Sequence, residues 1–326
     1  MGTQELVPFR LENISSKAYE HPADRAATAA LQSIPKLDVV VRKLIELQYE
    51  RALRQVLLAS SVKLGPDQLG DVWACYEHAH ATLDMPGAYD LYVSQYPIAN
   101  ASTIGARQPT IVLSSAVVSL LEPDELRTIV AHELGHILSD HVVYTTALQI
   151  LLRLGTARLP WAAGLPLRAI TAALLEWYRA AELSCDRAAT LANRDPLVTC
   201  RTLMSLAAGR RSRDLNLDAF LRQANEYEGW DSGWDKMRRL LIELSLDHDF
   251  PVRRCSELMR WVRSGDYDRI VGGDYPTRDQ PPDPRGAASE AADHYARRFR
   301  RFVEEAGEEV TRTGERLVEW LDRTGR

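Results

Sequence analysis

The hydrophobic residues in the first quarter of the chain recur at helical spacing. Across residues 22–83, apolar side chains fall three or four positions apart, as at Val40 and Leu44, and such residues share one face of a helix. Breaks near Pro35 and at Gly65-Pro66 interrupt the period. The pattern therefore predicts three helices in this part of the chain.

Two short runs of β-branched and aromatic residues follow, at 91–93 and 110–113, and predict strands. A helix is expected to begin at Pro123, because proline suits the first helical position and the acidic residues Asp124 and Glu125 complement the helix dipole. Further helices are predicted over about 144–178, 182–191 and 196–271. The fold class expected is α+β, mostly helical with a small antiparallel sheet.

The character of the sequence changes after residue 271. Residues 272–290 form a polar, proline-rich connector that cannot hold a core. Residues 291–326 carry one apolar stripe on a strongly charged pattern, which predicts an amphipathic C-terminal helix. Together with an irregular N-terminal tail at 1–22 and a main domain at 23–271, this gives four expected parts.

Composition and charge narrow the class of protein. The chain is 45% hydrophobic and 26% charged with a formal net charge of -5, and no basic segment suggests a nucleic-acid partner. Four scattered cysteines fit reduced thiols in a cytosolic protein. No apolar run reaches the roughly 18 residues of a spanning helix. We expect a cytoplasmic protein without a spanning segment, and peripheral membrane contact stays open.

A metal-site motif lies inside the helix predicted from Pro123. His132 and His136 bracket the sequence H-E-x-x-H, and residues four apart share one helical face, so both imidazoles can reach one ion. Glu133 lies about 100° round the helix from His132, where a base can take a proton from a metal-bound water. Gly135 costs the helix about 1 kcal/mol, which makes sense if another backbone passes close by.

A second acidic pair is available for the same metal. Glu182 and Asp186 are four apart on a predicted helix, surrounded by alanines rather than polar residues. Glu182 can serve as the third ligand, while Asp186 accepts a hydrogen bond from the free ring N–H of a ligand histidine. A fourth position is left for water, as catalytic zinc sites require.

The motif H-E-L-G-H, followed downstream by E-x-x-x-D, resembles the CAAX prenyl protease and HtpX-type family of zinc metallopeptidases. These are gluzincins, whose third ligand is a glutamate. The likeness spans about 92–261, and the interrupted hairpin at 142–178 is most similar to soluble members that lack spanning helices. The resemblance implies that each chain binds one Zn²⁺ through His132, His136 and Glu182. It also implies that Glu133 is the general base and that Asp186 accepts a hydrogen bond from a ligand histidine.

The resemblance also implies a substrate-binding edge strand. Residues 97–101 resemble the segment that precedes this strand in the family, and 110–115 resemble the strand itself. A peptidase of this type binds an extended polypeptide as an added strand. The residues expected to contact substrate are Asn100, Ala101, Ile111, Val112 and Leu113.

A later histidine is a further catalytic candidate. Family members carry a His-Pro segment with an arginine a few residues on, which covers the site or steadies the substrate carbonyl. This chain has His248, with a proline three residues later and arginines at Arg253 and Arg254. His141, by contrast, lies off the ligand face and is expected to be solvated or hydrogen-bonded.

The sequence therefore predicts a zinc metalloendopeptidase that hydrolyses extended or unfolded polypeptide. Three alternatives remain: a zinc-stabilised, non-proteolytic binding or chaperone-like scaffold, a helical adaptor that folds without zinc, and a zinc enzyme of a different reaction class. Glu133 argues against the scaffold, because it is not needed to hold the metal. The C-terminal helix is expected to dock on its own domain or to mediate self-association, together with the hairpin. Its acidic residues at 304–309 make a membrane surface the weaker partner.

Overall fold

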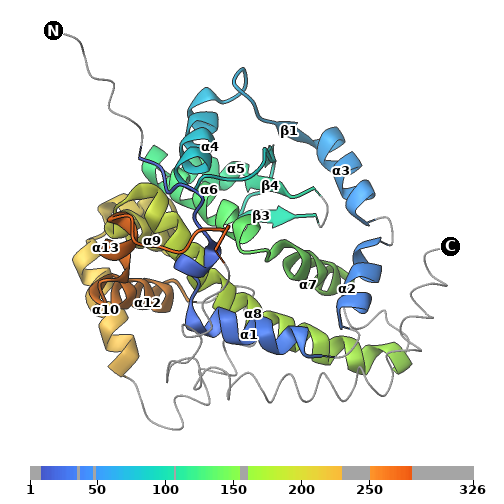
Figure 1. The fold of residues 1–326 in the computed structure, drawn as a ribbon. Coiled ribbons are helices and arrows are strands. Elements are labelled where there is room, and N and C mark those ends of the chain that lie inside the picture. The colour runs from blue at the N-terminus through green and yellow to red at the C-terminus, as the bar shows by residue number, and fades with distance from the viewer. Residues whose placement is uncertain are drawn as a thin grey trace.

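The computed structural model describes residues 9–34, 37–46, 49–105, 108–154, 161–229 and 250–280. Helices surround a small sheet (Figure 1), and the central helix beside that sheet is the one predicted from Pro123. The helices are α1 (Pro22–Gln32), α2 (Leu37–Glu46), α3 (Tyr49–Ser60), α4 (Gly70–Thr82), α5 (Ser115–Leu120), α6 (Pro123–Leu138), α7 (Val142–Leu154), α8 (Trp161–Asn193), α9 (Pro196–Ala208), α10 (Leu217–Gly229), α12 (Pro251–Arg263) and α13 (Asp266–Val271), and the strands are β1 (Ser61–Lys63), β2 (Asp90–Ser94), β3 (Ala101–Ile104) and β4 (Thr110–Ser114).

The sheet has the order β1-β2-β4-β3. β1 pairs with β2 and β3 with β4 in antiparallel fashion, but β2 and β4 run parallel. The α+β fold class is confirmed, with the difference that the sheet is mixed rather than wholly antiparallel. The reason is the order in which the chain forms the strands. After β2 the chain forms β3 on the far side of β4, and it then turns back to form β4 between them, parallel to β2.

The strand order corrects the predicted edge strand. β4 lies inside the sheet, between β2 and β3, so the 110–115 segment cannot accept an added strand. Ile111 and Leu113 are fully buried, and these two residues and Val112 pair with β3 rather than with a substrate. The edge strand beside the central helix is β3, which the sequence analysis did not recognise as a strand.

α6 begins as its sequence predicts. Pro123 occupies the first turn, Asp124 and Glu125 follow it, and the backbone N–H of Glu122 donates to Glu125 Oε2 at 3.1 Å. Apolar residues such as Val130 and Leu134 are fully buried in the main core. The helix therefore runs through the middle of the domain, between α4 on one side and α8 on the other (Figure 1).

α6 and α8 cross closely at Gly135. A Cβ placed on Gly135 would lie 3.0 Å from the Cβ of Ala188 and 3.4 Å from the Cα of Cys185. The glycine thus removes the side chain that would hold the two helices apart. This close crossing brings the acidic residues of α8 towards the histidines of α6.

The segment before α1 is irregular, as expected, but it is packed. Apart from a 3₁₀ turn at Ser16–Ala18, residues 9–21 are extended or bent, and Leu11, Ile14 and Tyr19 are buried. Ile14 forms a β-bridge with Thr277. The described part of the predicted connector therefore packs against the N-terminal segment, while the rest of the connector (281–290) and the predicted helix at 291–326 lie outside the described residues.

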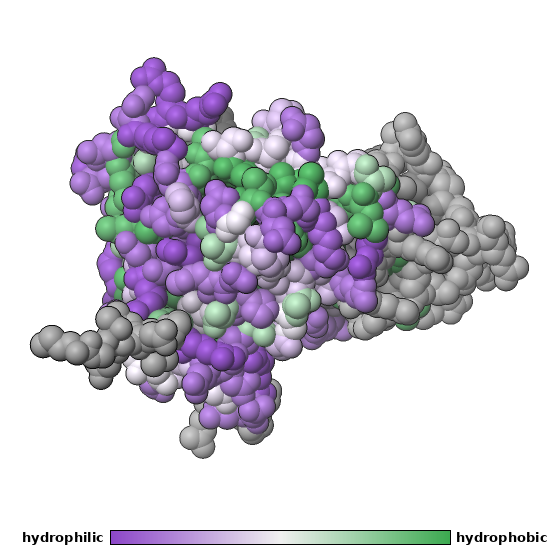
Figure 2. All heavy atoms as spheres, turned by 90° about the horizontal axis from the view of Figure 1, so that it is seen from above, coloured by the Kyte–Doolittle hydropathy of each residue, from purple (hydrophilic) through white to green (hydrophobic). Residues whose placement is uncertain are grey.

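A second core lies between α1, α2, α7 and α8. α8 is one helix of 33 residues, where the sequence analysis expected a hairpin arm and then a separate helix. Among the described residues, no helix is long and apolar enough to cross a membrane. The face seen in Figure 2 carries a band of hydrophobic residues among mostly hydrophilic ones.

Candidate active site

Three polar residues of α6 are held inside the protein rather than at its surface. His132, Glu133 and His136 are each less than a tenth exposed. Opposite them on α8, Glu182 Oε1 lies 3.5 Å from Nε2 of His132 and 3.2 Å from Nε2 of His136. The structure thus brings together the three predicted ligands, because one carboxylate oxygen of Glu182 lies beside the Nε2 atoms of both histidines.

Asp186 lies where the sequence analysis expected it. Its Oδ1 is 3.1 Å from Nδ1 of His132, the ring nitrogen that points away from Glu182. Both acids also contact Arg254, at the start of α12. Its Nη1 is 2.8 Å from Glu182 Oε2 and its Nη2 is 2.6 Å from Asp186 Oδ1. Arg254 was only one of two candidate arginines in the sequence, and the structure places it in the site.

The buried charges explain the perturbed pKa values here. Burial opposes protonation of His132, but the negative charges of Glu182 and Asp186 outweigh it and raise the pKa of His132 to about 10. Burial also opposes ionisation of Glu182, yet Arg254 and His132 hold the pKa of Glu182 well below its usual value. Glu182 is therefore an ionised carboxylate, and the pocket between the helices favours positive charge.

Glu133 is fixed by the edge strand. The hydroxyl of Thr103, in β3, donates to Glu133 Oε2 at 2.7 Å and also lies 3.2 Å from the Glu133 carbonyl oxygen. Thr103 is buried, so this hydrogen bond is shielded from water. Sequence reasoning missed Thr103, because nothing near it in the sequence shows which helix its strand would lie against.

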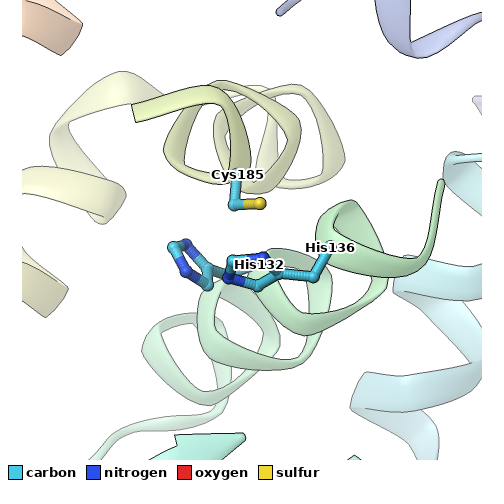
Figure 3. A group of neighbouring side chains, drawn as sticks. All are labelled: His132, His136 and Cys185. Atoms are coloured by element: carbon cyan, nitrogen blue, oxygen red, sulfur yellow. The ribbon is translucent and has the colours of Figure 1, made fainter. Parts of the chain in front are cut away.

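Cys185 offers a second metal-ligand set that sequence reasoning did not consider. Figure 3 shows His132 and His136 on α6, with Cys185 projecting towards them from α8. Ligand atoms of these three residues lie within 4.8 Å of one another. Burial raises the pKa of the Cys185 thiol well above its usual value, which disfavours the thiolate form that binds metals.

The far side of His136 faces His141 rather than solvent. The Nδ1 atoms of the two rings are 3.3 Å apart, and His141 is buried. Nε2 of His141 lies 3.0 Å from Oδ2 of Asp24, near the start of α1. His141 is therefore hydrogen-bonded, one of the two states expected, whereas Asp24 gave no sign of its role in the sequence.

A cavity of about 460 Å³ opens beside the ligands. Asn100 and Ala101, predicted to contact substrate, lie in its wall at the start of β3, and Glu133 lies in it too. Much of the remaining wall is apolar, and includes Val117, Ile129, Leu203 and Leu206. The cavity therefore joins the polar centre to a hydrophobic surface. His248, the remaining catalytic candidate, lies outside the described residues.

A buried H-E-x-x-H helix, a glutamate on a crossing helix and a flanking sheet edge together define a metallopeptidase of the zincin type. Residues 67–262 match peptidase family M48, and the chain belongs to this family. The chain is 36% identical over 271 residues to the plastoglobule-localized metallopeptidase 48, chloroplastic, of Arabidopsis thaliana, which covers 81% of this chain and 78% of that relative. No solved structure matches the chain. The predicted family and enzyme class are confirmed.

Proposed function

We propose that this metallopeptidase is a zinc-dependent endopeptidase that cleaves extended polypeptide, with His132, His136 and Glu182 as the metal ligands and Glu133 as the general base. The observation that carries the proposal is the convergence of two Nε2 atoms and one carboxylate oxygen beside Glu133, at the wall of an apolar cavity. Two nitrogens and one oxygen from the protein are a ligand set that catalytic zinc sites use.

The charge of the cluster supports a divalent cation. Among the described residues, the site holds three buried carboxylates, those of Glu133, Glu182 and Asp186, and the guanidinium of Arg254 pairs with the last two. Metal binding requires both histidines to be neutral, and in that state two negative charges in a buried site need a cation to compensate them. A doubly charged ion would balance them. Glu182 directs Oε2 to Arg254, whereas its Oε1 faces the Nε2 atoms of both histidines.

Glu133 is placed to transfer protons. Zinc, when bound, lowers the pKa of a coordinated water to about 7 and polarises the substrate carbonyl. The carboxylate of Glu133 then takes the proton of the attacking water and delivers it to the leaving amine. The hydrogen bond from Thr103 fixes one oxygen of Glu133, which leaves the other oxygen for the proton. Arg254 holds Glu182 and Asp186 in position behind the metal.

The edge strand and the apolar wall suggest how substrate binds. In the part of the chain that the structure describes, β3 pairs only with β4, and Asn100, just before β3, and Ala101, its first residue, lie in the cavity wall. An extended polypeptide added to β3 would pass the metal with its backbone hydrogen-bonded. A wall of aliphatic side chains would favour a hydrophobic residue next to the cleaved bond.

Location and assembly stay predictions. The relative's name places that protein at plastoglobules of the chloroplast, whereas we propose a cytoplasmic location for this chain from its scattered cysteines. Peripheral membrane contact and self-association are likewise proposed only from the patterns of the hairpin and the C-terminal segment.

The decisive experiment compares wild type with Glu133→Gln on an unfolded model protein, with the zinc content of both measured. Because Glu133 is the base and not a ligand, the variant should retain about one zinc per chain and lose cleavage by a factor of at least about 10². Zinc in both proteins with cleavage in neither would favour the non-proteolytic scaffold. Wild type without zinc would overturn the proposal.

A further inference from the structure

A chain of hydrogen bonds runs from His136 away from the cavity. It passes from Nδ1 of His136 to Nδ1 of His141, at 3.3 Å, and from Nε2 of His141 to Oδ2 of Asp24, at 3.0 Å. The carboxylate of Asp24 also accepts from the hydroxyls of Ser184, at 2.6 Å, and Thr28, at 3.2 Å. Asp24, His141 and Ser184 are buried, so water does not compete for these bonds.

When His136 binds a metal, only one placement of the ring protons gives each of these hydrogen bonds one donor and one acceptor. Coordination through Nε2 leaves the ring proton of His136 on Nδ1, so that atom donates. Nδ1 of His141 must then accept, which puts the His141 proton on Nε2, facing Asp24. Asp24 Oδ2, which accepts from the hydroxyl of Ser184, then accepts from Nε2 of His141 as well.

Each ligand histidine is thus connected to a carboxylate, one directly and the other through a second histidine. His132 contacts Asp186 directly, as ligand histidines commonly do, whereas His136 reaches Asp24 through a second imidazole. Asp186 lies within the residues that match family M48, but Asp24 lies before residue 67. A helix outside the matched segment therefore completes the surroundings of the metal site.

α1 is attached to α8 close to the ligand Glu182. The backbone N–H of His21 donates to Ser184 Oγ at 2.9 Å. Arg187 Nη1 donates to the carbonyl oxygens of Tyr19 and Glu20, each at 3.3 Å. These contacts hold the start of α1 against the turn of α8 that follows the ligand, and so determine where Asp24 lies.

We infer that His141 and Asp24 are positioning residues that hold His136 with its Nε2 towards the metal, so that the N-terminal helix α1 contributes to metal affinity. The inference rests on the metal ligands proposed above. Replacing the Asp24 carboxylate by an amide lets an N–H donor face His141, which reverses its tautomer and sets two N–H groups against each other at His136. Loss of such an outer contact lowers metal affinity by about 10- to 100-fold.

The test is the zinc dissociation constant, measured by competition with a chromogenic chelator. Asp24→Asn should bind Zn²⁺ about tenfold more weakly than wild type. The matched control is Glu257→Gln, another carboxylate-to-amide change beside a buried histidine. Glu257 Oε2 lies 3.6 Å from Nε2 of His21. In the described part of the chain, the hydrogen bonds of His21 to Ser184 and Ala23 do not involve His132 or His136. This variant should therefore bind zinc as wild type does.

A second variant separates positioning from support of the fold. His141→Gln interrupts the chain but keeps the bonds of Asp24 to Ser184 and Thr28, so α1 stays attached. It should also weaken zinc binding about tenfold, and Asp24→Asn should add little in the His141→Gln background, because the two act in series. If Asp24→Asn fails to fold, His141→Gln decides the question alone.

Three results would overturn the inference. Folded Asp24→Asn with the zinc affinity of wild type would do so, as would His141→Gln with that affinity, or losses that add fully in the double variant. In each of these cases wild type still binds zinc, so the proposed ligands stand and only the positioning role fails. Wild type that binds no zinc would overturn the ligand assignment and this inference together.

Discussion

At the residue scale, Glu182 and Cys185 are rivals for the third ligand position. Glu182 Oε1 faces the Nε2 atoms of both histidines. Cys185 Sγ instead lies 3.7 Å from Nδ1 of His141, on the side of His136 that faces the hydrogen-bonded chain. An ionised carboxylate that faces both Nε2 atoms is better placed to bind the metal than a buried thiol beside Nδ1 of His141.

This difference predicts opposite behaviour for two variants. Glu182→Gln should lose most of its zinc, because an amide oxygen carries no charge to bind the ion. The substitution also removes the ion pair between Glu182 and Arg254. Cys185→Ala should retain about one zinc per chain. Zinc content after gel filtration, measured by mass spectrometry, checks both. Retention by Glu182→Gln together with loss by Cys185→Ala would assign the metal to the cysteine set.

The residues that could be predicted are those whose spacing is local. His132 and His136, and likewise Glu182 and Asp186, are four apart on one helix, so the sequence shows that each pair shares a face. Thr103, His141 and Asp24 reach the site from separate elements, and their contacts depend on tertiary packing. Such contacts leave no periodic signal in a single sequence.

At the scale of elements, the crossing of α6 and α8 at Gly135 sets the distance between the histidines and Glu182. We expect Gly135→Ala to destabilise the protein by roughly 1 kcal/mol. The added methyl group would lie 3.0 Å from Ala188 Cβ, and overpacking of about 1–3 kcal/mol outweighs the gain in helix propensity of about 1 kcal/mol. Urea denaturation of the metal-free protein measures the change.

Gly70→Ala is the control for that experiment. Gly70 opens α4, and a Cβ there would meet nothing within 4 Å, so the substitution should be neutral or slightly stabilising. Equal behaviour of the two variants would mean that the crossing has room for a side chain. The proposed role of Gly135 in bringing the helices together would then be wrong.

The elements also show where sequence patterns stop being sufficient. The start of α6 followed from Pro123 and the acidic residues after it, because capping signals act within one turn. Strand order has no such local signal. β4 is the more hydrophobic run and was expected at the edge, yet it lies inside the sheet, where both of its neighbours cover its backbone. The short β3, with Ser102 and Thr103, has the weaker strand pattern and forms the edge.

At the scale of the whole molecule, the metal site joins parts that are distant in the sequence. α6, α8 and α12 meet at the ligands and Arg254, and α1 reaches them through Asp24. A cation bound between these helices would link the main core to the second core around α1, α7 and α8. Metal binding and folding should therefore be coupled.

This coupling predicts that removal of zinc destabilises the whole fold, because the ion links three ligands on two helices and balances buried negative charge that Arg254 offsets only in part. Zinc at 100 times its dissociation constant should contribute about 2.7 kcal/mol, which for a domain of this size raises Tm by about 5 °C or more. Scanning calorimetry of metal-free protein with and without added Zn²⁺ measures the shift. Glu182→Gln should show little of it, whereas Glu257→Gln should respond as wild type does. A metal-free protein that unfolds at the same temperature as the zinc-loaded one would instead support a helical adaptor whose fold does not depend on zinc, since binding to the native state alone must raise its stability.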